Sequence, residues 1–213
     1  LLTLVLTITG IYLWWPKLNK IKQAFTIKRN ASFTRFNIDL HKTVGIYTAI
    51  IMLSVAFSGV YFNLPQIFKP AVNFFSPLDN MNGMAAMMEM SEKMKSTPIE
   101  GVKPLTPDAI ALAVETAYPN IDIQRIILAN KPTDSIRVTG RQAGEIRHKG
   151  ATNIWIDQYS GKFLQVRDPL TFNAGNAFTN IQLSLHNGEI LGQTGRIMVL
   201  MTGFAPLLLM VTG

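Results

Sequence analysis

Residues 35–64 read RFNIDLHKTVGIYTAIIMLSVAFSGVYFNL. From Val44 to Leu64 this stretch contains no charged residue. At a helical rise of roughly 1.5 Å per residue, it covers about the 30 Å of a bilayer's hydrocarbon core. The sequence therefore predicts a transmembrane helix at residues 43–64, with His41 just before its start.

Two further segments have the same apolar character. The chain is 48% hydrophobic and only 15% charged, and its apolar residues concentrate at the two ends as well as in the centre. Trp14, Trp15 and Lys17 are typical of the end of a membrane span, where aromatic rings and a basic residue meet the interface. We expect transmembrane helices at residues 1–15 and 186–213, the second with a kink at Pro206.

The positive charge lies in one segment. Of the twenty basic residues, seven lie in residues 16–42, where Asp39 is the only acidic residue. A short loop rich in lysine and arginine between two spans is expected on the cytoplasmic side. This placement argues against nucleic-acid binding, which needs basic residues spread over a folded surface. It also puts residues 65–185 outside the cytoplasm.

Both ends of the sequence lie within apolar segments. LVLTITG at residues 4–10 aligns with LLLMVTG at residues 207–213, with two leucines, a threonine and a glycine shared. We therefore expect this sequence to be a fragment of a longer protein that repeats the unit.

Residues 65–185 are predicted to form an inserted α+β domain. Thr106 is expected to cap a helix that begins at Pro107 and runs to Ala117. Strands are predicted at 121–128, 135–139, 152–156 and 163–166, and one helix against a small antiparallel sheet is an α+β arrangement. The entry segment, residues 81–95, contains six of the ten methionines. Thioethers bind Cu(I), but we favour a helix that uses these flexible side chains for packing.

Several classes of function are excluded by what the sequence lacks. There is no cysteine, so disulfides, thiolate metal sites and a cysteine nucleophile are ruled out. The sequence contains no Gly-x-Ser-x-Gly, His-Glu-x-x-His or phosphate-loop motif. A transporter subunit also lacks support, because the apolar runs of the predicted spans, residues 1–15, 44–64 and 197–213, contain no acidic or basic residue.

Motifs along almost the whole chain resemble those of the PepSY-associated transmembrane proteins, often called iron-regulated inner-membrane proteins. The matching residues are Thr9-Gly10 with Trp14 to Lys17, Asp39 to Lys42 with Gly45, Ser58-Gly59, Ile156 to Gly161, and Leu185 to Gly188 with Leu191-Gly192 and Gly195-Arg196. The resemblance implies a multi-pass protein of the bacterial inner membrane with an extracytoplasmic PepSY-like domain. Some members of this family are similar to ferric-siderophore reductases, which carry haem b between their helices.

The resemblance gives His41 and His186 a candidate role as axial ligands of haem iron, which imidazole can bind. Each has a simpler alternative: His41 could only anchor a helix at the interface, and His186 could be a solvent-facing turn residue. The third histidine, His148, lies between strands and is expected on the surface.

His41 and His186 are expected at opposite faces of the membrane, so one haem cannot bind both. The hypothesis is two haems, one near each face, with electrons moving outward. The missing repeat would supply the partner ligands, and the extracytoplasmic domain would shape a site for a ferric siderophore. The competing interpretation is a PepSY-like binding or protease-modulating module, anchored by helices and without redox activity.

Overall fold

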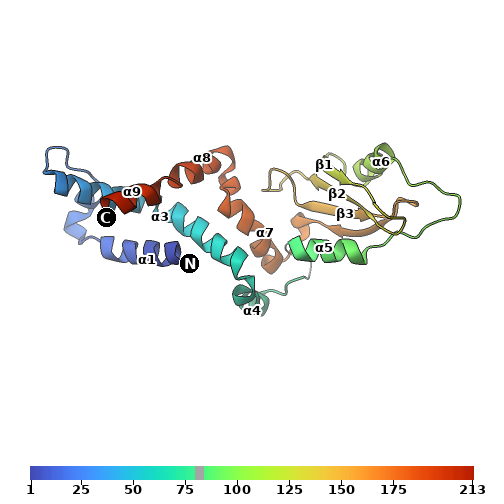
Figure 1. Cartoon of the computed structure of the whole chain (residues 1–213), viewed down its shortest axis with the longest axis horizontal. Helices are drawn as coiled ribbons and strands as arrows, with labels where there is room; N and C mark the ends of the chain where they lie inside the picture. Colours follow the sequence, from blue (N-terminus) through green and yellow to red (C-terminus); the bar gives the residue numbers. More distant parts are fainter. Residues whose placement is uncertain (80–83) are drawn as a thin grey trace. The chain divides into compact units, whose positions relative to one another are not determined.

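The structure, a computed structural model, describes residues 1–79 and 84–213 and divides into two compact units (Figure 1). Leu1–Phe68 and Gln182–Gly213 form the first, here called the helical unit. Lys69–Ile181 form the second, here called the sheet unit. The membrane segments and the α+β domain expected from the sequence thus correspond to different units. Whether the sheet unit lies outside the cytoplasm remains a prediction.

The longest helix of the helical unit is α3, Phe33–Asn63. It begins at Phe33, well before the predicted boundary at residue 43. The Ser32 Oγ caps this start by accepting a hydrogen bond from the Arg35 amide at 3.4 Å. No glycine or proline follows to interrupt the helix before its apolar part. The basic segment before it contains two short helical turns, η1 (Leu18–Lys20) and α2 (Ile21–Ala24).

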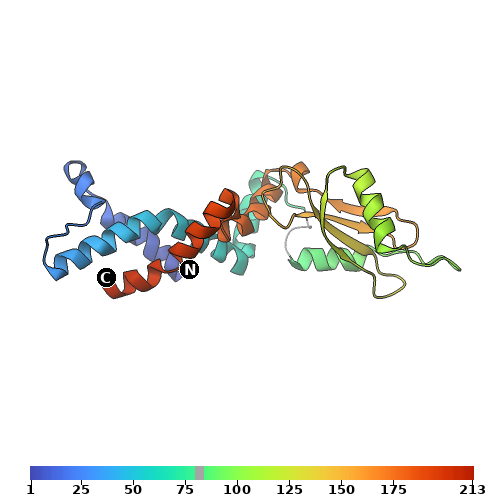
Figure 2. The same cartoon turned by 90° about the horizontal axis from the view of Figure 1, so that it is seen from above.

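Two apolar helices lie alongside α3 in both views (Figures 1 and 2): α1, Leu2–Trp14, and α9, Ala205–Thr212. They contain the two similar segments of residues 4–10 and 207–213. Before α9 come η3 (Glu189–Leu191) and α8 (Gly192–Thr202). The helix is interrupted at Gly203 and Phe204, and α9 carries Pro206 in its first turn, where the missing amide hydrogen costs nothing. The interruption thus lies two residues before Pro206, and the predicted kink at this proline stays a prediction.

Among residues 1–79 and 84–213, two helical stretches are long and apolar enough to cross a membrane. They are Phe33–Asn63, with a mean hydropathy of 1.8, and Glu189–Thr212, with 1.7. The apolar helix Leu2–Trp14 is shorter, at 13 residues. Large apolar side chains on these helices face outward, including Leu13, Ile50 and Met210. Such a surface is expected of helices in contact with lipid.

In the described part of the sheet unit, four antiparallel strands form a sheet in the order β1-β2-β3-β4. One face of the sheet packs against α6, Pro107–Ala117, and buries Ile110 and Val114 of that helix. The Thr106 Oγ1 accepts a hydrogen bond from the Ala109 amide, which confirms the predicted cap.

The strands are close to those predicted: β1 is Asp122–Ile127, β2 is Ile136–Arg141, β3 is Thr152–Ile156 and β4 is Phe163–Arg167. The strand β2 continues through Gly140 to Arg141, two residues beyond the predicted end at 139.

The methionine-rich helix α5, Met84–Lys93, lies on the other face of the sheet (Figure 1). The fully buried Trp155 of β3 donates a hydrogen bond from Nε1 to the Ser91 Oγ at 2.9 Å. The beginning of the predicted methionine-rich segment lies outside the described residues. The remaining elements are α4 (Pro65–Phe75), η2 (Pro169–Thr171) and α7 (Ala174–His186).

Candidate functional site

His41 lies on α3 where the end of α9 meets it. Its ring is half-buried, and its Nδ1 lies 3.3 Å from the Thr212 Oγ1. The neighbouring residue of Thr212 is Gly213, and a side chain there would collide with the imidazole ring. The ring therefore occupies space that only glycine leaves open.

His186 ends α7 and lies against α3 as well. Its Nδ1 is 3.0 Å from the Ser58 Oγ and 3.1 Å from the Val55 carbonyl oxygen. The Phe62 ring meets the imidazole edge to face at a centroid distance of 5.6 Å. Gly59 also lies next to the ring. A methyl group placed there would be at ordinary contact distance from the imidazole Cε1. His186 is thus half-buried against a helix and does not face solvent as a simple turn residue would.

The hydrogen bonds determine which ring nitrogen carries the proton in the neutral imidazoles. The Thr212 hydroxyl donates to the Leu208 carbonyl at 2.8 Å, and the Ser58 hydroxyl donates to the Ser54 carbonyl at 2.7 Å. A hydroxyl has a single hydrogen, so each of these oxygens can only accept from the histidine. With these hydroxyls as acceptors, Nδ1 is the donor in both rings and the lone pair is left on Nε2. The Val55 carbonyl oxygen, which can only accept, favours the same tautomer for His186.

Neither Nε2 has a hydrogen-bond partner among residues 1–79 and 84–213. A histidine whose Nδ1–H is held by an oxygen and whose Nε2 is free has the arrangement typical of metal-bound histidines. In both rings Nδ1 is held by the chain itself, and Nε2 is the nitrogen that these contacts leave without a partner.

A cavity of about 680 Å³ in the helical unit adjoins His41. This volume falls in the range of sites for small molecules and cofactors. Gly10, Gly45 and Ala49 leave room along its walls, and the lining is otherwise mostly apolar. His41 and Lys42 are among the few polar side chains of this lining.

The two histidines do not converge on one site. His41 and Ser58, the contact of His186, are both on α3, and at roughly 1.5 Å per residue they lie about 25 Å apart along the helix axis. The third histidine, His148, is exposed on the sheet unit, as predicted. Within the described part of the chain, no three histidine or acidic residues group closely enough to hold a metal ion by themselves.

Sequence reasoning identified the two rings and the motifs that contain both hydroxyls, but missed that these hydroxyls contact the rings. The hydroxyls belong to Ser58 and Thr212, each followed directly by a glycine. The repeated Ser/Thr-Gly pair could have indicated these ring contacts. It places a hydrogen-bonding oxygen next to a position without a side chain.

Comparison with known proteins identifies a family. The family model described as the PepSY-associated TM region matches residues 1–213. No curated protein matches the chain.

Proposed function

This chain belongs to the family of PepSY-associated transmembrane regions, and on that basis we propose that it is a haem-binding electron-transfer protein of the membrane. The observation that carries the proposal is the free Nε2 of both His41 and His186, each ring being held through Nδ1 by a residue of another helix. Bound haem b supplies the one-electron redox chemistry, with iron that accepts an axial imidazole.

The residues around His41 fit a haem. The cavity is apolar for most of its surface and is open beside glycine and alanine residues, which suits a flat macrocycle. Lys42 also lines the cavity and provides a positive charge for an acidic substituent of the ligand. Thr212 fixes the orientation of the ring, so the imidazole needs little reorganisation when it binds.

His186 is held as a ligand at the other end of α3. Two acceptors, a hydroxyl and a backbone carbonyl, hold its Nδ1–H, and Phe62 restricts the ring further. We assign the second ligand of each haem to a histidine of an equivalent repeat. In this proposal electrons move from the site at His41 to the site at His186 and then to a ferric siderophore outside the cytoplasm.

The test is an absorption spectrum of the purified full-length protein before and after dithionite. We expect a reducible b-type spectrum. His41→Ala and His186→Ala should each remove one haem per chain, whereas His148→Ala is the matched control and should keep both.

Two outcomes would contradict the proposal in different ways. A colourless wild-type protein would favour the PepSY-like binding or protease-modulating module. A coloured protein whose haem content is unchanged in both His41→Ala and His186→Ala would place the haem elsewhere.

A further inference from the structure

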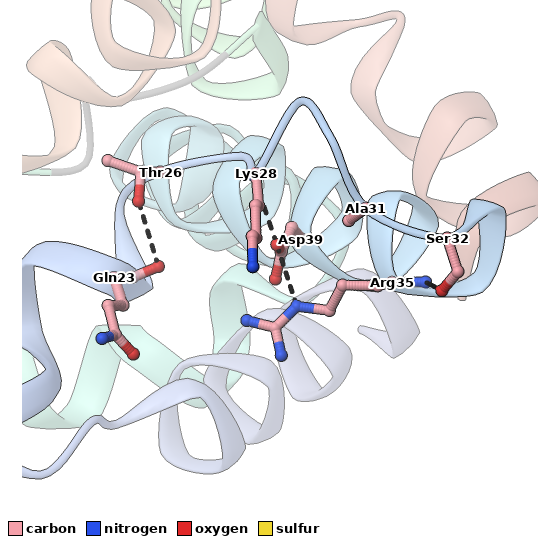
Figure 3. A pocket seen from close by; sticks show the side chains of 7 residues that line it. All are labelled: Gln23, Thr26, Lys28, Ala31, Ser32, Arg35 and Asp39. Atoms are coloured by element: carbon pink, nitrogen blue, oxygen red, sulfur yellow. Dashed lines mark hydrogen bonds and ion pairs between the residues drawn. The ribbon is translucent and has the colours of Figure 1, made fainter.

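The helical unit has a second, polar cavity, formed by the segment after α2 and the first turns of α3. Its volume is about 630 Å³. Figure 3 shows the ammonium group of Lys28 and the guanidinium group of Arg35 directed toward the same space, which Gln23 borders from the other side. It is lined by Gln23, Thr26, Lys28, Ala31, Ser32, Arg35 and Asp39.

The charges of this cavity favour an anion. Asp39 is 2% exposed, and its carboxylate already contacts the Arg35 Nε at 3.0 Å and the Lys42 Nζ at 3.7 Å. The Lys28 amide also donates to its Oδ2 at 3.4 Å. Asp39 therefore positions the surrounding basic residues. The Lys28 ammonium has no hydrogen bond or ion pair among the described residues, so its charge is available to a ligand.

The segment next to the cavity has the surface of a membrane-interface element. Trp15 is 76% exposed and Leu18 is 89% exposed, and lysines at 17, 20 and 22 alternate with these apolar residues. The segment is held against the neighbouring helices, because the Trp14 Nε1 donates to the Ala24 carbonyl and Phe25 packs edge to face on Trp14. Exposed apolar side chains beside basic residues are typical of segments at the level of lipid headgroups.

We propose that this cavity binds the phosphate of an anionic phospholipid headgroup. Lys28 and the outer nitrogens of Arg35 would pair with the phosphate, and Gln23 and Thr26 would provide further polar contacts. Guanidinium and ammonium groups are the usual phosphate partners in proteins. We favour a lipid over a soluble phosphate because the segment that leads into Gln23 carries exposed Trp15 and Leu18, which offer acyl chains an apolar surface. The proposal does not depend on haem binding.

Native mass spectrometry of the full-length protein in detergent can test the site. The protein is incubated with equal amounts of phosphatidylglycerol and phosphatidylcholine, and the ratio of the two bound lipids is measured. Lys28→Gln should lower the preference for phosphatidylglycerol about fivefold, the factor expected for one basic residue at an anionic membrane surface. This variant removes no hydrogen bond of the folded chain, and the double variant with Arg35→Gln should lose more.

Arg29→Gln is the matched control, because it removes the same charge from the next residue, which does not line the cavity. It should change the lipid preference less than about twofold. An equal loss in Arg29→Gln and Lys28→Gln would show diffuse attraction to the loop and overturn the site. Displacement of the bound phosphatidylglycerol by millimolar inorganic phosphate or glycerol 3-phosphate would show a soluble-phosphate site and overturn the lipid assignment.

Discussion

Two glycines hold the turn that follows His186. Gly188 has a φ of 78°, and a side chain on either Gly188 or Gly195 would overlap the backbone of the other. The close approach brings the start of α8 back onto the end of α7, where Glu189 and Arg196 form an ion pair. Gly188 and Gly195 therefore position the start of α8 next to His186, the candidate haem ligand.

At this scale we predict that Gly195→Ala destabilises the helical unit by roughly 2–3 kcal/mol, because the added methyl group meets backbone that cannot move aside. Thermal unfolding of the full chain in detergent measures the change. Gly10→Ala is the control, since a methyl group there has no neighbour within 4 Å and the helical backbone accepts alanine. Equal melting temperatures for the two variants would show that the Gly188–Gly195 contact is not needed.

Among the elements, the connection from β3 to β4 depends on one carboxylate. Asp157 is 5% exposed and accepts hydrogen bonds from the Thr97, Tyr159 and Ser160 amides at 2.8–2.9 Å. Burial raises the pKa of Asp157, but these bonds together outweigh burial and hold the pKa below its ordinary value. The bond to Thr97 also ties the segment before α6 to the sheet.

Because the folded-state pKa of Asp157 is depressed, its contribution to stability is present above the ordinary pKa near 3.8 and is lost as the pH falls through the lower folded value. Asp157→Asn should cost about 2 kcal/mol at pH 7, since hydrogen bonds to a charged acceptor become bonds to a neutral one. Hydrogen exchange in β3 of the full chain measures the loss of protection. The gap between wild type and variant should shrink below about pH 4, and a gap that stays constant down to pH 2 would refute this role.

For the whole molecule, the charge distribution predicts its orientation. The basic residues of 16–42 should face the cytoplasm, and the sheet unit should face the opposite side. The chain has no cysteine, so a single cysteine substitution reports the side of the membrane on which it lies without background labelling at other positions. Lys149→Cys should react with a membrane-impermeant maleimide in intact cells, and Lys20→Cys only after permeabilisation. Reaction of Lys20→Cys in intact cells would show that the orientation is the opposite one. The basis for outward electron transfer would then be lost.

The elements of this protein were largely predictable from the sequence. The uncharged run from Val44 to Leu64, the cap at Thr106 and the alternating strands of the sheet unit all depend on residues close together in the chain. The start of α3 differs from the prediction because the basic composition of residues 16–42 indicates a loop, whereas Ser32 caps a helix that begins at Phe33.

The sequence by itself also determined which rings are candidate ligands, His41 and His186, because the motifs around them are local. Only the tertiary structure decided how these rings are held. His41 meets Thr212 across 171 residues, and His186 meets Ser58 across 128. Which hydroxyl receives which Nδ1–H depends on how α3, α7 and α9 pack together. Local periodicity leaves that packing open, since many pairings of apolar helices bury similar surface.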